Sequence, residues 1–490
     1  MPTLTLHPTR EAVAERTSKG KAGSRRGKET LALTISPGQR RLFTLLTLLL
    51  PLLFFAAVEG GLRLAGYGED YALFIPFGPD PDYLQVNPGV GRRYFPAAEA
   101  PLPGFELLRA HKDPRALRFF VQGASTAVGF PYGHQVAFGR LVRAALRRAA
   151  NSRPVEVVNT ALTAVNSYTL LDLAPEIAAR DPDGVLIYAG HNEYYGAFGV
   201  GSAISVGRSG RLVRAYLGLR RLRTVQLLRN LLVRVRPTVA DGGRSAPMER
   251  VVARERIPYG SSLYRAGEEQ YRANLHRLLS FYEEREIPVY LATLVSNLRD
   301  LPPFIGTPRD PEILPGWEAA VRETRAALAT GDTAAAREGL ARALAADSMA
   351  AEAHYLKGRL LEAEGRPAEA LAAYVRAWDL DELRFRAPSG FNDVVRAEAA
   401  EHGAVVVDVA GAFAAASPHG LIGDSLLTEH VHPNMRGTRL LAAAFTEAVE
   451  RGATARGGAT GRAATGAAAT GTATGAAATG TATGAAATGT

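Results

Sequence analysis

The pattern that most constrains the fold is a series of five short apolar runs separated by longer stretches of helical periodicity. The runs cover 117–121, 155–159, 184–189, 287–293 and 404–409. Apolar runs of this length, bounded by Gly, Pro and polar residues, are typical of strands buried on both faces. Strands that alternate with helices form parallel sheets covered by helices on both sides. The sequence therefore predicts an α/β fold in three layers, with a parallel sheet in the middle.

Ser125 lies where the first run gives way to a helical pattern. The run ends in 121–129, Val-Gln-Gly-Ala-Ser-Thr-Ala-Val-Gly, and 135–148 has the apolar spacing of a helix. Gly123 and Gly129 allow a sharp turn and the close approach of a ligand. A serine at such a turn is either a nucleophile at the carboxyl end of a strand or only the N-cap of a helix.

Three more polar stretches could share a site with Ser125. One follows the second run at 159–167, one follows the third at 190–193, and one precedes the last helix at 429–434. Loops after neighbouring parallel strands face one crevice. Acyl transfer to serine needs a base, a group that orients the base and donors for the oxyanion. The stretches supply these types as His432, Glu429 and Asn192.

These four stretches, in this order, resemble the SGNH hydrolases, also called the GDSL esterase/lipase superfamily. The resemblance covers about 115–300 and 385–450. It implies a flavodoxin-like three-layer sandwich whose catalytic residues are Ser125 as nucleophile, His432 as base and Glu429 as the partner of the base. It also implies an oxyanion hole formed by the N–H groups of Ser125 and Ala164 and by the side-chain amide of Asn192.

The chain departs from the family pattern at three positions. Ala124 stands where the family has an aspartate that steadies the turn. Ala164 stands where the family has a glycine, but its backbone N–H remains available. Glu429 replaces the usual aspartate, so its carboxylate must approach the histidine by a different rotamer. None of these changes removes the nucleophile, the base or an oxyanion donor.

Other residues of the same stretches have alternative interpretations. Gly190, His191 and Tyr194 are candidate substrate-binding residues, although His191 could be a loop histidine with satisfied hydrogen bonds and Tyr194 could only pack. Asn192 could simply cap a helix. His430 is the rival base, but Pro433 and the asparagine after it favour His432. We expect no cofactor and no metal, because the pair 430/432 lacks nearby ligands and no lysine follows 123–129 as a phosphate loop requires.

The N-terminal region predicts a membrane anchor. Residues 1–41 hold nine Lys or Arg against three acids, and 42–58 is uncharged and rich in Leu and Phe. The apolar stretch, extended to 42–64, is long enough to cross a bilayer. The alternatives are a buried core helix and a cleaved signal peptide. We expect a single-pass protein of the cell membrane, with 1–41 in the cytoplasm and the catalytic domain outside. Because this tail holds much of the net positive charge, no nucleic-acid partner is predicted.

Two further stretches have no clear period. Residues 66–115, rich in Pro, Gly and Tyr, are predicted to be an irregular connection that wraps the domain. Residues 452–490 are Ala, Gly and Thr in short repeats, and they contain too few large apolar side chains to offset the entropy of ordering. We therefore predict a disordered tail from 452.

Two insertions interrupt the α/β pattern of the hydrolase domain, which is predicted to span 116–310 and 385–450. The first, 200–260, contains nine arginines and no acid over 208–236. It predicts a helical hairpin packed on the domain, a helix on a membrane surface or a basic wall for an acidic polymer, and the sequence does not choose between them.

The second insertion, 317–382, repeats with a period of 34. Gly331 and Gly365 are 34 apart, as are Ala336 and Ala370. The pattern resembles two tetratricopeptide repeats, which are stacked helix pairs. Two units are fewer than usually stand alone, so they must lean on the main domain. A protein partner and a purely structural role are equally compatible with them.

The sequence predicts a membrane-anchored serine hydrolase acting on ester bonds. Its substrate would be an acylated small molecule or glycan, such as O-acyl groups of envelope or secreted polysaccharide. One alternative is a polysaccharide O-acyltransferase. Another is an envelope scaffold of little activity, which binds a protein partner through 317–382.

Overall fold

The computed structural model describes residues 36–149, 153–204, 209–235 and 256–468. The chain divides into two compact units, 1–61 and 62–490. The predicted basic tail lies outside the described residues except for 36–41.

The first unit consists of most of helix α1, Pro37–Leu64. The helix begins before the predicted residue 42 because Ser36 and Gln39 form a reciprocal cap. Gln39 N donates to Ser36 Oγ (3.2 Å) and Ser36 N donates to Gln39 Oε1 (3.0 Å). With 28 residues and a mean hydropathy of 2.2 in its most apolar window, α1 is long and apolar enough to cross a membrane.

The second unit is built on the predicted parallel sheet. All five apolar runs form strands: β4 (Leu117–Gly123), β5 (Val155–Asn159), β6 (Gly184–Tyr188), β7 (Val289–Ala292) and β8 (Val405–Val407). Their order is β5-β4-β6-β7-β8 and every pair is parallel. This is the flavodoxin-like order, in which the chain turns in opposite directions on either side of β4. The predicted α/β fold class is confirmed.

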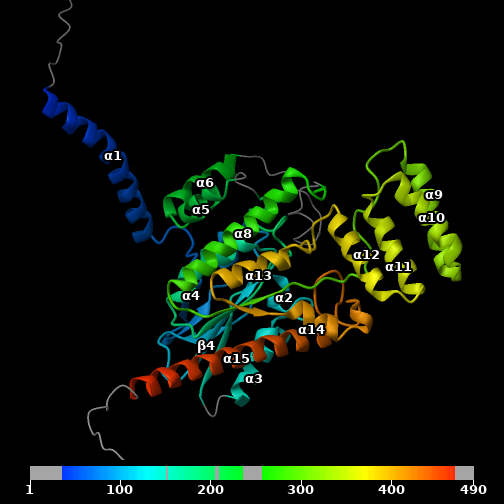
Figure 1. Cartoon of the computed structure of the whole chain (residues 1–490). Coiled ribbons are helices and arrows are strands. Elements are labelled where there is room, and N and C mark those ends of the chain that lie inside the picture. The colour runs from blue at the N-terminus through cyan, green and yellow to red at the C-terminus, as the bar shows by residue number, and fades with distance from the viewer. Residues whose placement is uncertain (1–35, 150–152, 205–208, 236–255, 469–490) are drawn as a thin grey trace, which may run out of the picture. The chain divides into compact units, whose positions relative to one another are not determined.

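Helices cover both faces of this sheet (Figure 1). One face carries α3 (Phe138–Ala149), α15 (Met435–Ala468) and the short α14 (Val409–Ala415); the other carries α4 (Ser167–Ala178), α8 (Ser262–Glu283) and α13 (Phe391–Glu401). Aromatic stacking joins each layer internally. Phe138 lies on Phe445 with ring centroids 4.8 Å apart, and Tyr271 lies on Phe391 at 4.4 Å. Short elements complete the layers: α2 (Ser125–Val128), η1 (Val90–Arg93), η2 (His134–Val136) and η3 (Pro418–Gly420).

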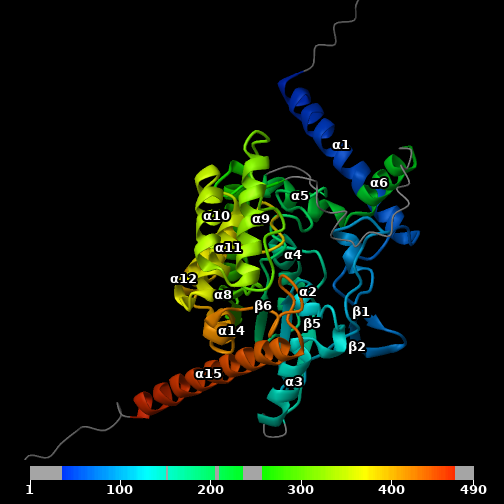
Figure 2. The same cartoon turned by 90° about the vertical axis from the view of Figure 1, so that its right-hand side faces the viewer.

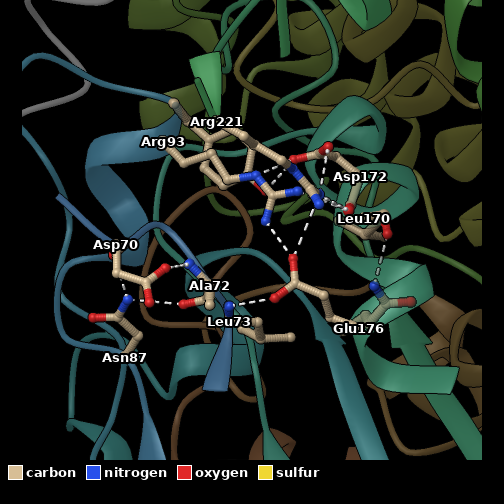
Figure 3. A network of polar contacts seen from close by, with 11 residues as sticks. Asp70, Ala72, Leu73, Asn87, Arg93, Leu170, Asp172, Glu176 and Arg221 are labelled. Carbon is tan, nitrogen blue, oxygen red and sulfur yellow. Dashed lines mark hydrogen bonds and ion pairs between the residues drawn. The ribbon is translucent and has the colours of Figure 1, made fainter. Parts of the chain in front are cut away.

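The prediction that 66–115 is irregular was wrong in part. It contains a three-stranded antiparallel sheet formed by β1 (Phe74–Phe77), β2 (Asp80–Val86) and β3 (Leu107–Arg109). Buried Arg93 fixes this segment to α4 through Asp172 (2.5 Å) and Glu176 (2.7 Å), as Figure 3 shows. Glu176 also accepts from Leu73 N. The order of the segment therefore depends on contacts with residues about 80–100 positions away, which local periodicity does not reveal.

The Arg-rich insertion forms a helix pair, α5 (Gly210–Arg220) and α6 (Arg223–Val235). The pair matches the predicted helical hairpin; 205–208 and 236–255 of the insertion lie outside the described residues. Val213 and Leu217 are buried on the domain side of α5.

The repeat insertion forms two helix pairs (Figure 2). The first pair is α9 (Leu314–Thr330) with α10 (Thr333–Ala346), and the second is α11 (Ala351–Ala363) with α12 (Pro367–Leu380). Helix α9 begins three residues before the predicted start of the insertion. Gly331 and Gly365 end the first helix of each pair with φ of 78° and 72°. Ala336 and Ala370 are fully buried at equivalent places. The second pair shares an apolar cluster with Leu298 and Leu421 of the α/β body. The helix pairs are thus observed, whereas a partner for them remains a prediction.

Helix α15 continues to Ala468, past residue 452, where the disordered tail was predicted to start. Its first turns are docked by Leu441, Phe445 and Val449, which are buried. Alanine has the highest helix propensity, so an Ala-rich sequence readily prolongs a helix that is already nucleated. Residues 469–490 lie outside the described residues.

Candidate active site

Ser125 occupies the predicted turn between β4 and the short helix α2. The turn is tight because Gly123 approaches β6 closely: a Cβ on Gly123 would lie 2.5 Å from the carbonyl oxygen of Tyr188. Gly129 ends α2 with φ of 99°. Ala124 makes no side-chain cap. The half-buried Ser125 thus stands at the carboxyl end of β4, next to the switch point of the sheet.

The structure brings Ser125, His432 and Glu429 into one hydrogen-bonded chain. Ser125 Oγ lies 2.6 Å from His432 Nε2, and His432 Nδ1 lies 2.6 Å from Glu429 Oε1. With the proton of the neutral imidazole on Nδ1, Nε2 is the acceptor for the serine hydroxyl. This is the order of contacts in a nucleophile–base–acid triad.

The loop that carries His432 is held from several sides. Glu429 Oε1 also accepts from His432 N (2.8 Å), and Thr428 N donates to the carbonyl of His432 (2.8 Å). Asn434 accepts from the N–H groups of Arg436 and Gly437 and so caps α15. The longer glutamate therefore reaches the imidazole from a compact loop, and the departure from aspartate leaves the hydrogen bond intact.

His430, the rival base, does not contact Ser125. Its Nδ1 pairs with the other oxygen of Glu429, and its ring packs edge-on against Phe304 (5.5 Å). The structure therefore favours His432 over His430, as the following proline suggested.

Burial sets the protonation of these histidines. It lowers the pKa of His432 to about 4, that of His191 to about 3 and that of His430 to about 2. A neutral His432 is the form that can accept a proton. The imidazole is therefore ready to act as a base even in mildly acidic solution.

We expect kcat/KM for ester hydrolysis to keep its plateau value down to about pH 5. The rate should fall only as pH drops toward the His432 pKa of about 4, because the imidazolium cannot take the serine proton. An ordinary histidine would lose activity near pH 6.5. A pH profile with a short-chain nitrophenyl ester checks this, and an acid limb at or above 6.5 would contradict it.

The predicted oxyanion donors lie on loops that are tied to one another. The loop after β5 reaches the serine turn through Asn159 Nδ2, which donates to the carbonyl of Ala127 (2.6 Å). It reaches the loop after β6 through Ala197 N, which donates to the carbonyl of Ala164 (3.1 Å). Asn192 is 6% exposed, and its side-chain amide forms no hydrogen bond with another described residue. These contacts place Ala164 and Asn192 on the two loops that flank Ser125.

Ala164 has the backbone conformation of a glycine, with φ of 58°. A Cβ in the left-handed region costs about 1 kcal/mol. We expect Ala164→Gly to raise the free energy of unfolding by about this amount and to keep ester turnover, since the backbone N–H is unchanged. Denaturant unfolding and kcat measure the two effects. Ala161→Gly in the same loop, where φ is not positive, is the control and should be destabilising.

The three predicted substrate-binding residues are buried, and the structure gives them packing roles. Tyr194 is fully buried and donates to the carbonyl of Tyr264 (3.1 Å). His191 accepts from Ala387 N (3.3 Å). Gly190 lets the chain pass Leu294, whose Cδ1 would lie 2.4 Å from an added Cβ. A role for them in substrate binding stays a prediction.

Glu193 is a structural residue beside the site. Its carboxylate accepts from Ser167 Oγ (2.7 Å), Ser167 N (3.1 Å) and Gln270 Nε2 (2.6 Å). Burial raises the pKa of Glu193. Through these bonds the loops after β5 and β6 are joined beneath the proposed oxyanion donors.

An exposed aromatic rim around His432 was missed by sequence reasoning. Phe130 lies against the His432 ring with centroids 4.6 Å apart and is half exposed. Tyr132 is also exposed, and its hydroxyl lies 3.4 Å from Thr428 Oγ1. Phe304 completes the rim beside His430. The only signal in the sequence was the Phe-Pro-Tyr that follows Gly129.

Two described clusters could present ligand atoms to a metal ion. One is Glu429, His430 and His432, whose contacts the triad explains; the other is His276, Glu398, Glu401 and His402 on α8 and at the end of α13. In the second cluster the two imidazoles lie 3.0 Å apart and His402 bonds Glu283 (2.7 Å). Hydrogen bonding between α8 and α13 accounts for these contacts.

Comparisons with known proteins give only distant likenesses. No protein-family model matches the chain, and no curated protein matches it. Among solved structures it is similar to an acetyl xylan esterase (10% identity, TM-score 0.31, covering 68% of this chain and 100% of that one). It is also similar to a GDSL-like lipase from Bacteroides thetaiotaomicron (10%, 0.29, 68% and 88%) and a lipase/acylhydrolase from Enterococcus faecalis (14%, 0.29, 68% and 94%). Values this low assign no function, which must come from the geometry of the site.

Proposed function

We propose that the chain is a serine hydrolase of SGNH type acting on ester bonds. The observation that carries the proposal is the continuous hydrogen-bonded chain from Ser125 Oγ through His432 to Glu429. Such a chain activates a hydroxyl group whose own pKa is far too high for it to be ionised.

In the proposed mechanism, Ser125 Oγ attacks the ester carbonyl while His432 Nε2 takes the hydroxyl proton. Glu429 stabilises the imidazolium that results. The N–H groups of Ser125 and Ala164 and the amide of Asn192 donate to the oxyanion. His432 then gives its proton to the leaving alcohol, and water repeats the sequence to release the acid and restore Ser125.

The aromatic rim supports a glycan as the alcohol part of the substrate. Phe130 packs on His432, and the exposed rings of Tyr132 and Phe304 contact Thr428 and His430 of the same loop. A pyranose ring has an apolar face of similar size to an aromatic ring. We therefore propose O-acyl groups of an envelope or secreted polysaccharide as the substrate. Helix α1 would hold the enzyme in the membrane as a single span with the catalytic unit outside.

Two alternatives start from the same features. A sugar hydroxyl that replaces water as the acceptor would make the protein a polysaccharide O-acyltransferase. A scaffold of little activity would use the helix pairs α9–α12 to bind a protein partner, an alternative favoured by the substitution of Ala124 and Ala164 for family residues.

Covalent labelling by a fluorophosphonate probe tests the proposal. The full chain in detergent should be labelled, whereas Ser125→Ala and His432→Ala should lose labelling and keep the parent circular dichroism spectrum. Product analysis on acetylated glycans, with and without an unacetylated sugar as acceptor, then distinguishes hydrolysis from acyl transfer. A folded parent that is neither labelled nor active on esters would refute the hydrolase and favour the scaffold.

A further inference from the structure

The helix pair α5–α6 exposes leucines and arginines together. Between 210 and 231 it contains six arginines and no acidic residue. Leu212 and Leu228 are 59% and 52% exposed, and Leu219 and Leu231 are about as open. Leu212 and Leu219 are seven residues apart on α5, and Leu228 and Leu231 are three residues apart on α6. On each helix the two leucines therefore lie on one face. Exposed leucines between arginines are the composition of helices that lie in a membrane interface.

The pair is anchored to the domain by its opposite side. Val213 and Leu217 are buried, and Arg221 bonds Asp172 (3.3 Å) beside the buried Arg93 (Figure 3). Arg220 donates to the carbonyl of Arg92 (3.0 Å). The exposed leucines are therefore not the face with which the pair packs on the α/β body.

Helix α6 is also tied to the residues that directly follow α1. Asn230 Nδ2 donates to Tyr67 Oη (3.1 Å), and Gln226 bonds both the N–H and the carbonyl of Glu69 (2.9 and 3.2 Å). Tyr67 N in turn donates to the carbonyl of Leu62, in a glycine-capped helix end. Residues 62–69 are thus joined to α6 by hydrogen bonds within the second unit.

We propose that α5 and α6 lie on the outer membrane–water interface, with their exposed leucines among the lipid chains near the headgroups and with Arg211 and Arg229 on lipid phosphates. The proposal rests on the anchoring by α1 proposed above. Tyr67 is three residues past the end of α1, so it lies within about 10 Å of that end, at up to about 3.5 Å per residue. A span that ends near Leu64 places α6 at the interface.

A lipid surface fits this face better than an acidic polymer does. A polyanion would use the arginines but leave the exposed leucines in water. An interface satisfies both, since apolar side chains enter it and arginines reach the phosphates. The catalytic unit would then have one orientation on the membrane and would not reorient freely about its anchor.

Depth-dependent quenching tests the proposal, because the chain has no cysteine and single cysteines can be labelled. Leu219→Cys and Leu228→Cys report on the pair, Leu53→Cys reports on the anchor and Met349→Cys, between α10 and α11, is the control. Each full-length variant carries an environment-sensitive fluorophore. Each is placed in vesicles of phosphatidylethanolamine and phosphatidylglycerol with nitroxide lipids, the nitroxide being either near the headgroup or deep in the bilayer.

Labels at 219 and 228 should be quenched several-fold more by the shallow nitroxide than the label at 349. Arg211→Glu with Arg229→Glu should weaken this quenching and leave ester hydrolysis unchanged. Equal quenching at 219, 228 and 349, with the label at 53 quenched by the deep nitroxide, would overturn the membrane contact of the pair while preserving the anchor. An unquenched label at 53 would overturn the anchoring itself. A spectral shift at 228 caused only by an added polyuronate would assign the face to an acidic polymer and also overturn the proposal.

Discussion

Ser125→Ala and His432→Ala should each abolish nearly all ester turnover, with a loss in kcat of roughly 10⁵–10⁶-fold. Either change breaks the 2.6 Å contact between Ser125 Oγ and His432 Nε2, so no hydroxyl can be activated. A loss of this size corresponds to about 7–8 kcal/mol of transition-state stabilisation. Initial rates on a nitrophenyl ester and on acetylated glycan measure it.

The double variant should be no slower than either single variant, because the serine and the histidine act as one unit. The rate that remains should come from substrate binding and the oxyanion donors. Ser167→Ala is the matched control: this serine is buried beside the site and bonds Glu193 rather than a histidine. If the two losses were additive, or if Ser125→Ala kept a tenth of the parent rate, the proposed nucleophile would be wrong.

The parts of the fold that could be predicted from the sequence are those marked by a pattern in neighbouring residues. Each strand of the parallel sheet is an apolar run, and the end of such a run locates Ser125 directly. The 34-residue period predicted the helix pairs because Gly331 and Gly365 end helices in the same left-handed conformation. The pairing of Ser125 with His432, 307 positions apart, followed from the chemistry that a serine nucleophile needs and from the family resemblance, and it was not visible in any local pattern.

The features that the sequence did not reveal concern long-range contacts and side-chain direction. The sheet of β1–β3 is stabilised by Arg93, whose partners lie on α4. Tyr194 follows Asn192 by two residues, yet its ring is enclosed by Tyr264 and Phe391. Left-handed Ala164 is a further case, since alanine gives no sign of a positive φ. In each case the deciding atoms come from another part of the chain.

Glu429→Gln should lower kcat/KM by about 10³–10⁴-fold without unfolding the protein. The amide is nearly isosteric, but it lacks the charge that stabilises the imidazolium, and its NH₂ group can turn toward His432 and favour the wrong tautomer. Loss of the carboxylate should also shift the acid limb of the pH profile further down, since an anion favours the protonated histidine. Rates measured from pH 8 down to well below the His432 pKa of about 4 report both effects.

His430→Phe separates the two histidines that share Glu429. His430 holds one carboxylate oxygen and His432 the other, and only His432 reaches the serine. A phenyl ring can take the place of the His430 ring beside Phe304 and Phe385. We therefore expect His430→Phe to stay within about tenfold of the parent, a small effect for a group outside the reacting chain. If His430→Phe were as inactive as Glu429→Gln, the carboxylate would act through His430, and the proton route from Ser125 would have to be drawn anew.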